Sequence, residues 1–155
     1  MPASMLVLAP HANSYNRLVP GAHAPTKICW AYENRTVAIR VPGGSHKARR
    51  IEHRVAGGDV NPYLLLSAVL GAALDGIEQE MTPPPPVSGN AYALDIAELP
   101  KTWEDALDRF ETDTALTQIF PKTLIENMCF TKRQEMKTLT ALSEEERIAL
   151  YLQFL

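Results

Sequence analysis

The first third of the chain alternates short apolar runs with polar turns, a pattern typical of β-strands. Alternating β-branched and aromatic residues predict strands over residues 27–32, 36–41 and 50–55. The apolar run 5–8 predicts a further short strand. Clusters of asparagine, glycine and proline separate these runs. We expect the strands to form part of an antiparallel sheet.

Residues 61–80 show the pattern of one long helix. Asn61 is a good helix cap because its side chain accepts hydrogen bonds from free backbone N–H groups, and Pro62 is tolerated at the first helical position. The first part of this segment is apolar almost all round, which predicts a buried helix. The four prolines 83–86 end it. A long buried helix packed on a partial antiparallel sheet, with helices after it, defines an α+β fold.

The last third of the chain is predicted to be helical. Thr102 and Ser143 each stand three positions before an acidic residue, which is the pattern of a capped helix start. They predict helices over 103–111 and from 144 onward, with another helix over 122–139 between them. The apolar residues of the last helix are Ile148, Tyr151, Leu152 and Phe154.

Length and composition narrow the class of protein. A chain of 155 residues with 46% hydrophobic and 21% charged residues is an ordinary globular domain, or part of a larger one, and not a disordered or fibrous protein. The apolar stretch 63–74 is too short to cross a bilayer, so we expect no membrane partner. Cys29 and Cys129 are too few for a disulfide scaffold, and no charged leader precedes an apolar run. These features predict a cytoplasmic protein.

Charge is distributed unevenly along the chain. Residues 1–54 contain six arginines, two lysines and two acids, while the remainder is strongly acidic and the whole chain has a net charge of −3. An acidic protein is not a general nucleic-acid binder. The arginines suit a local site for phosphate or carboxylate, because each guanidinium donates two parallel hydrogen bonds. A solvated basic face is the alternative, and composition alone slightly favours it.

The strand pattern places several of these charges on one surface. Side chains alternate between the two faces of a strand, so Arg50, Glu52 and Arg54 share a face. Arg40 of the preceding strand is expected to join them. Such a surface would bind an anion between its arginines, and Glu52 would either pair with them or hold a divalent metal. A ladder of ion pairs between strands is the alternative, and the spacing favours neither.

Five linked motifs in this region resemble, in order and spacing, the C-terminal catalytic half of the glutamine synthetases. They span residues 13–21, 34–42, 48–54, 59–64 and 74–77. The resemblance is strong over residues 5–80 and weaker through the final helices. It implies an ATP-dependent ligase in which glutamate is phosphorylated to γ-glutamyl phosphate and then attacked by ammonia or a primary amine. It also implies Mg²⁺ or Mn²⁺ as the metal.

The resemblance assigns a role to each matching residue. Arg17 and Arg54 would bind glutamate. Arg35, Arg40 and Arg50 would surround the ATP phosphates, with Arg35 and Arg40 also acting on the developing charge of the reaction. Glu52 would be a metal ligand.

One departure from the family pattern lies in the segment Gly21-Ala-His-Ala-Pro25. His23 stands where the ammonia-using enzymes carry a glutamate that helps to bind and deprotonate ammonium. A neutral histidine is a weaker ammonium site but is able to take a proton from an incoming amine. This variant resembles the γ-glutamylpolyamine and γ-glutamylputrescine synthetases, and we include His23 among the catalytic candidates. The alternative is a drifted loop residue, and no residue here identifies the amine.

The second departure is the absence of the family's upstream metal-binding motifs. We therefore expect residues 1–155 to be a C-terminal fragment of the catalytic domain, inactive alone, whose full-length parent forms a homo-oligomer. Its expected parts are an active-site portion (residues 1–60), a buried helix (61–80), a Pro-rich connection (81–101) and a helical tail (102–155). The alternatives are a non-catalytic module that binds nucleotide or glutamate, and an interaction fragment.

Overall fold

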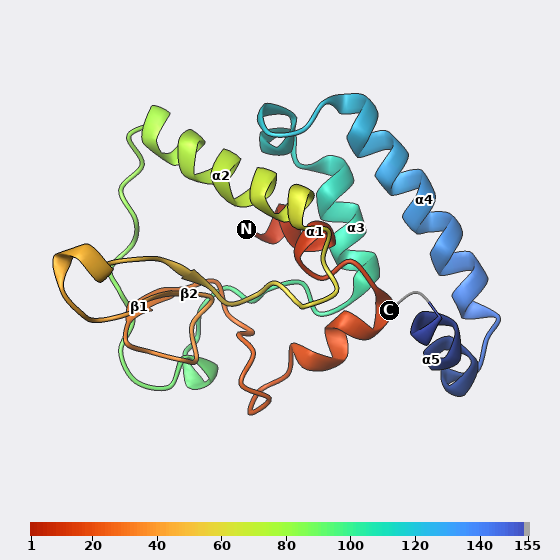
Figure 1. The fold of residues 1–155 in the computed structure, drawn as a ribbon, viewed down its shortest axis with the longest axis horizontal. Coiled ribbons are helices and arrows are strands. Elements are labelled where there is room, and N and C mark those ends of the chain that lie inside the picture. Colours follow the sequence, from red (N-terminus) through yellow and green to blue (C-terminus); the bar gives the residue numbers. More distant parts are fainter. Residues whose placement is uncertain (154–155) are drawn as a thin grey trace.

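The computed structural model describes residues 1–153 and combines a small sheet with several helices, as the α+β prediction requires (Figure 1). Phe154, predicted on the last helix, lies outside the described residues. The strands are β1 (Trp30–Tyr32), β2 (Ile39–Val41) and β3 (Glu52–His53). The α-helices are α1 (Met5–Leu8), α2 (Pro62–Glu78), α3 (Trp103–Thr112), α4 (Lys122–Thr140) and α5 (Glu144–Leu152). Short 3-10 turns are η1 (Pro2–Ser4), η2 (Ala12–Arg17), η3 (His46–Ala48), η4 (Ala91–Ala93) and η5 (Thr114–Gln118).

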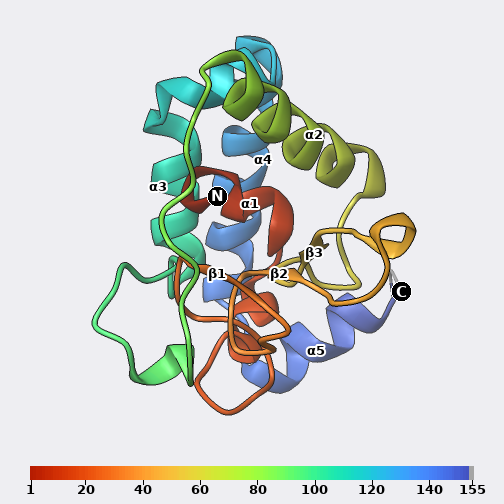
Figure 2. The ribbon, with the colours of Figure 1, turned by 90° about the vertical axis from the view of Figure 1, so that its left-hand side faces the viewer.

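The centre of the molecule is α1, which lies between α2, α3 and α4 (Figure 2). The prediction of a strand over residues 5–8 is wrong, since this segment is helical and all four of its side chains are buried. A run of four apolar residues does not by itself distinguish a strand from a buried helix. Here Pro2 begins a 3-10 turn that leads directly into the helix, as proline at a helix start favours.

The three strands form one sheet in the order β1-β2-β3. The predicted antiparallel arrangement is correct for β2 and β3, but β1 and β2 run parallel, with Trp30 opposite Ile39. The connection 33–38 therefore returns the chain to the start of β1 and does not form a hairpin. Asn34 stabilises this return, because its side-chain oxygen accepts hydrogen bonds from the N–H and the hydroxyl of Thr36.

Helix α2 begins as predicted. The side chain of Asn61 accepts hydrogen bonds from the backbone N–H groups of Tyr63 and Leu64, at 3.0 and 3.2 Å. The prediction that the helix is buried is wrong for the described chain, where Ala68 is its one fully buried residue. A row of large apolar side chains is exposed instead: Tyr63, Leu66, Leu70, Leu74 and Ile77.

The helical tail forms as predicted around the core. The hydroxyl of Thr102 caps α3 by accepting from the N–H of Asp105, and Ser143 and Glu146 complete a reciprocal capping box at α5. Helix α3 packs against α1 and α4 through its apolar face. Among residues 1–153, no helix is both long and apolar enough to span a bilayer.

Candidate active site

Glu52 lies between two arginines on the surface of the sheet. Because β2 and β3 are antiparallel, Arg40 stands directly opposite Glu52 and donates to its Oε2 at 2.8 Å. Arg54 donates from Nε to the other carboxylate oxygen at 3.0 Å. Desolvation alone would raise the pKa of Glu52, but the hydrogen bonds and charges of Arg40 and Arg54 outweigh it and lower that pKa. Glu52 therefore stays ionised.

Arg54 also binds the backbone of two neighbouring loops. Its Nη2 donates to the carbonyl of His23 at 3.0 Å, and its Nη1 donates to the carbonyls of Arg35 and Val37. The side chain is only 12% exposed. One guanidinium thus fixes the 21–25 loop and the 35–37 turn beside Glu52.

Arg17 reaches the same region from η2. Its Nη2 donates to the carbonyl of Val55, the residue after Arg54, at 2.6 Å. The η2 turn is held by Ser14, whose hydroxyl donates to Asp59 at 2.8 Å. Two separate segments of the sequence therefore bring Arg17 and Arg54 to one stretch of backbone.

Within residues 1–153, the other predicted site residues make no side-chain hydrogen bond to Glu52. The side chains of His23 and Arg35 are exposed, and their backbone carbonyls contact Arg54. His23 has a left-handed backbone, with φ of 59°, so the loop presents its side chain from a tight turn. Arg50 is exposed before β3 and donates to the carbonyl of Ala48 at 3.3 Å. Within residues 1–153, Arg50 makes no hydrogen bond to Glu52 or Arg54, and its place on their surface stays a prediction.

The prediction missed a second carboxylate on Arg40. Glu33 follows β1 directly and accepts from Arg40 Nη2 at 2.9 Å, and this hydrogen bond raises the pKa of Arg40. The sequence places Glu33 in a turn, where periodicity says nothing about side-chain direction. No feature of the sequence pairs it with Arg40, because that contact depends on the parallel register of β1 and β2.

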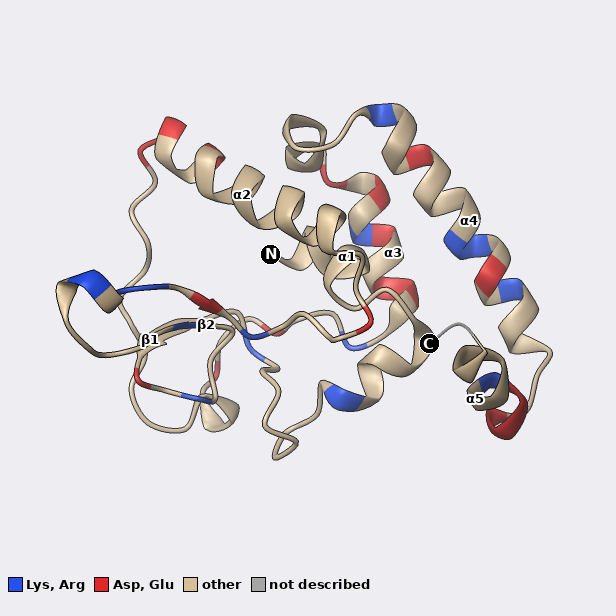
Figure 3. Ribbon diagram, in the orientation of Figure 1, with Lys and Arg blue, Asp and Glu red and all other residues tan. Residues whose placement is uncertain are grey.

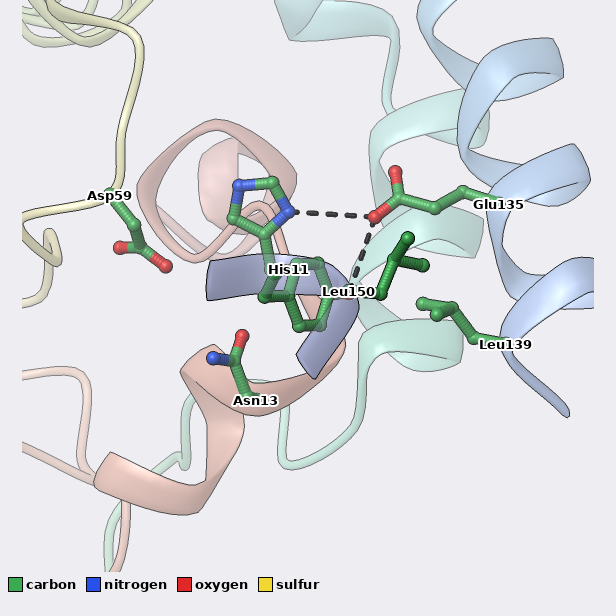
Figure 4. A pocket seen from close by; sticks show the side chains of 7 residues that line it. His11, Asn13, Asp59, Glu135, Leu139 and Leu150 are labelled. Atoms are coloured by element: carbon green, nitrogen blue, oxygen red, sulfur yellow. Dashed lines mark hydrogen bonds and ion pairs between the residues drawn. The ribbon is translucent and has the colours of Figure 1, made fainter. Parts of the chain in front are cut away.

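A separate cavity of about 340 Å³ lies behind η2, against α4 and α5 (Figure 4). Glu135 accepts from Tyr151 at 3.3 Å and lies 3.5 Å from His11 Nδ1, while Asp59 and Asn13 face His11 from the other side (Figure 4). Burial raises the pKa of Tyr151 to about 12, which keeps its hydroxyl protonated. These contacts hold the loop that carries Arg17 against the C-terminal helices.

The described residues do not make a complete metal site. No three His, Cys, Asp or Glu side chains within residues 1–153 are grouped closely enough to hold a metal ion. Glu52 offers carboxylate oxygens, which suit Mg²⁺, but both are occupied by arginines. Basic residues lie on and beside the sheet near Glu52, whereas the first turns of α3 and α5 are acidic (Figure 3). The surface therefore combines two arginines with carboxylates of the chain itself.

Residues 1–151 match the glutamine synthetase catalytic domain, and the chain belongs to that family. It is 45% identical over 115 residues to the γ-glutamylethanolamide synthetase GlnA4 of Streptomyces coelicolor. This alignment covers 74% of this chain and 25% of the relative. The chain is 43% identical over 110 residues to the γ-glutamylputrescine synthetase PuuA of Escherichia coli, covering 71% and 23%.

Two further matches extend over nearly the whole chain. The glutamine synthetase of Sulfolobus acidocaldarius is 37% identical over 158 aligned residues, covering 94% of this chain and 33% of the relative. A solved structure titled "Apo GmaS without ligand" superposes with a TM-score of 0.76 at 30% identity, covering 94% of this chain and 34% of that one. The chain therefore spans about a quarter to a third of the length of these relatives.

Proposed function

We propose that this chain is the C-terminal catalytic portion of an ATP-dependent ligase that joins glutamate to an amine through γ-glutamyl phosphate. The observation that carries the proposal is Glu52 held between Arg40 and Arg54. Transfer of a phosphoryl group needs fixed cations around the phosphate oxygens and a divalent metal. A surface with two preorganised arginines and one ionised carboxylate supplies part of both requirements.

We infer the residue roles from this arrangement and the family membership. Arg17 and Arg54 bind the glutamate substrate, and the hydrogen bond of Arg17 to the carbonyl of Val55, the residue after Arg54, supports a shared ligand. Arg40, with the exposed Arg35 and Arg50, binds the ATP phosphates. Glu52 is a ligand of Mg²⁺ or Mn²⁺, which would supply Lewis-acid stabilisation of phosphate charge, and its other ligands lie outside residues 1–153.

His23 is proposed to face the incoming amine. Its left-handed turn holds an exposed imidazole on a loop that Arg54 anchors by its backbone. An imidazole is able to accept a proton from a primary amine near neutral pH. The names of two relatives, a γ-glutamylethanolamide and a γ-glutamylputrescine synthetase, support a primary amine over ammonia.

The active protein is proposed to be longer and homo-oligomeric, so the 155-residue chain alone is expected to be inactive. Its location is proposed to be the cytoplasm, since both cysteines are free, as is usual in a reducing compartment. A non-catalytic module that binds nucleotide or glutamate is the second candidate. The occupation of both Glu52 carboxylate oxygens by arginines favours it for the chain taken alone.

The test uses a hybrid in which residues 1–151 replace the homologous segment of the Streptomyces coelicolor relative. Phosphate release is measured with MgATP and glutamate, using ethanolamine, putrescine or ammonium as acceptor. We expect release with a primary amine to exceed release with ammonium, and the variant His23→Glu to shift the preference toward ammonium. The unmodified chain alone is expected to release no phosphate.

Each other result has a defined meaning. Preference for ammonium that His23→Glu leaves unchanged would make His23 a loop residue with no role in amine choice. Phosphate release by the 155-residue chain alone would refute the proposal that this chain is inactive. A hybrid that binds MgATP but releases no phosphate with any acceptor would favour the non-catalytic module.

A further inference from the structure

Glu33 is an acidic residue to which the proposed reaction gives no role. Its Oε2 accepts from Arg40 Nη2 at 2.9 Å, while Glu52 accepts from Arg40 Nη1 at 2.8 Å. Both Nη atoms of the guanidinium therefore donate to carboxylates of the chain itself, while the buried Nε has no partner within residues 1–153. A phosphate that binds the two Nη atoms as a parallel fork competes with one of these carboxylates.

Exposure shows which carboxylate is on the outside. The side chain of Arg40 is 12% exposed, that of Glu52 is 37% exposed and that of Glu33 is 58% exposed. Glu52 is also held by Arg54, whereas Glu33 pairs with no second arginine within residues 1–153. Glu33 is therefore the carboxylate that an approaching anion meets first and displaces more easily.

The backbone forms a specific seat for Glu33. The residue has a left-handed conformation, with φ of 53°, and its N–H donates to the carbonyl of Val41 at 3.2 Å. Its Oε1 accepts from the N–H of Gly43. A Cβ added at Gly43 would lie 2.6 Å from that same oxygen, so an alanine there requires the end of the flexible Glu33 side chain to shift.

Charge on this surface is balanced while Glu33 is seated. Arg40 and Arg54 contribute two positive charges, and Glu33 and Glu52 contribute two negative charges within the same hydrogen-bonded group. Withdrawal of Glu33 leaves one net positive charge, centred on Arg40, at the position where a polyphosphate would bind.

We propose that Glu33 is an internal counter-anion that occupies the phosphate position on Arg40 and is displaced when a polyphosphate binds. The inference rests on the proposed function, because it assumes that Arg40 contacts the nucleotide phosphates. Glu33 then sets the affinity of the site and its choice of ligand. A polyphosphate has the charge to displace it, whereas a single carboxylate or inorganic phosphate gains less from the exchange.

The test is the affinity of the 155-residue chain for MgATP, measured by titration calorimetry at low ionic strength. Glu33→Gln removes the charge but keeps an oxygen for the N–H of Gly43. We expect it to bind MgATP about two to five times more tightly than the parent, the range typical of an exposed ion pair. The gain should shrink as salt is added, because salt screens exposed charges.

Two further variants sharpen the result. Gly43→Ala leaves the charge unchanged but obstructs the seat of Glu33, and it should raise the affinity in the same direction. Glu98→Gln removes an equivalent charge from an ion pair with Lys27 elsewhere, and it should leave the affinity unchanged. Circular dichroism and the Tm establish that each variant folds.

The outcomes separate this inference from the proposed function. Binding of MgATP with equal or weaker affinity by Glu33→Gln would overturn the counter-anion role while leaving the nucleotide site intact. Failure of the parent and all variants to bind MgATP would overturn the counter-anion role in this chain, while the ligase proposal is tested separately by phosphate release from the hybrid. Binding by Glu33→Gln alone would support the inference in its strongest form, in which the seated carboxylate blocks the site.

Discussion

Helices α2 and α3 both carry a row of large apolar side chains, but the two rows lie in different surroundings. In α3, Trp103 and Phe110 are at most 4% exposed, because this face packs on α1 and α4. In α2, Leu66 and Leu70 are 56% and 59% exposed. Helical periodicity therefore predicts which face of a helix is apolar, but it does not supply the surface that covers that face.

The same contrast divides the molecule into two regions. The packing around α1, α3 and α4 is complete within the described residues and includes the fully buried Leu107 and Phe110. The region of the sheet and α2 carries the exposed apolar side chains of α2 and, on and beside the sheet, the charged residues coloured in Figure 3. The first region holds the fold together, and the second presents the surfaces with which the proposed active site is built.

The largest effect should separate a core leucine from an exposed one. We expect Leu107→Ala to lower the free energy of unfolding by about 2–5 kcal/mol, because it opens a cavity in the packed region. Leu66→Ala on the exposed face of α2 should change it by about 0.5 kcal/mol or less. Urea unfolding of both variants is the measurement. Similar losses in the two variants would show that the face of α2 is covered in solution.

Arg54 should matter to the stability of the charged surface. Replacement by alanine removes donors from the carbonyls of His23 and Val37 and from Glu52, so we expect a loss of about 1–3 kcal/mol. Amide exchange should also become faster in the 21–25 loop. Arg50→Ala is the matched control, because Arg50 contacts only the nearby carbonyl of Ala48 among the described partners. Equal effects of the two changes would contradict the anchoring role of Arg54.

The contact between α4 and the loop at His11 should depend on pH through Glu135. Desolvation opposes ionisation there, but His11 and Lys132 outweigh it and lower the pKa of Glu135 below its ordinary value. A lowered folded-state pKa contributes stability above the unfolded-state value of about 4.3, and this contribution is lost as the pH falls through the folded-state pKa. The stability difference between the parent and Glu135→Gln should therefore shrink below about pH 4. A difference that stays constant from pH 7 to pH 3 would show that the ionised carboxylate contributes nothing.

The smallest change in stability should come from the outer face of α2. Leu70→Gln combined with Leu74→Gln is expected to change the free energy of unfolding by about 0.5 kcal/mol or less. The double variant should nevertheless bind less of a hydrophobic fluorescent dye than the parent, because it removes exposed apolar surface. Lys122→Gln, at an exposed charged position, is the control. Unchanged dye binding would indicate that this face is not accessible.

The parts of the fold that depend on local sequence were predictable. The caps at Asn61, Thr102 and Ser143 act on backbone groups a few residues away, so their side chains identify the helix starts. The grouping of Glu52 with Arg54 follows from the two-residue period of a strand.

The parts that depend on distant segments were not predictable. The helix at residues 5–8 and the parallel register of β1 and β2 result from packing and from the return of the chain at Asn34. The contact between Glu33 and Arg40 follows from that register. The exposure of α2 depends on which surface lies opposite, which no pattern within the helix encodes.

Glu52 provides the most direct test of the proposal that the sheet surface is half of a ligase site. The hybrid carrying residues 1–151 is assayed for MgATP-dependent amide formation with Glu52→Gln and, in parallel, with Glu98→Gln. The proposal predicts a loss of at least about 100-fold for Glu52→Gln, the scale of removing a preorganised electrostatic group, and near-parent activity for Glu98→Gln. Activity of Glu52→Gln within about twofold of the parent would contradict the assignment of this surface as the catalytic site.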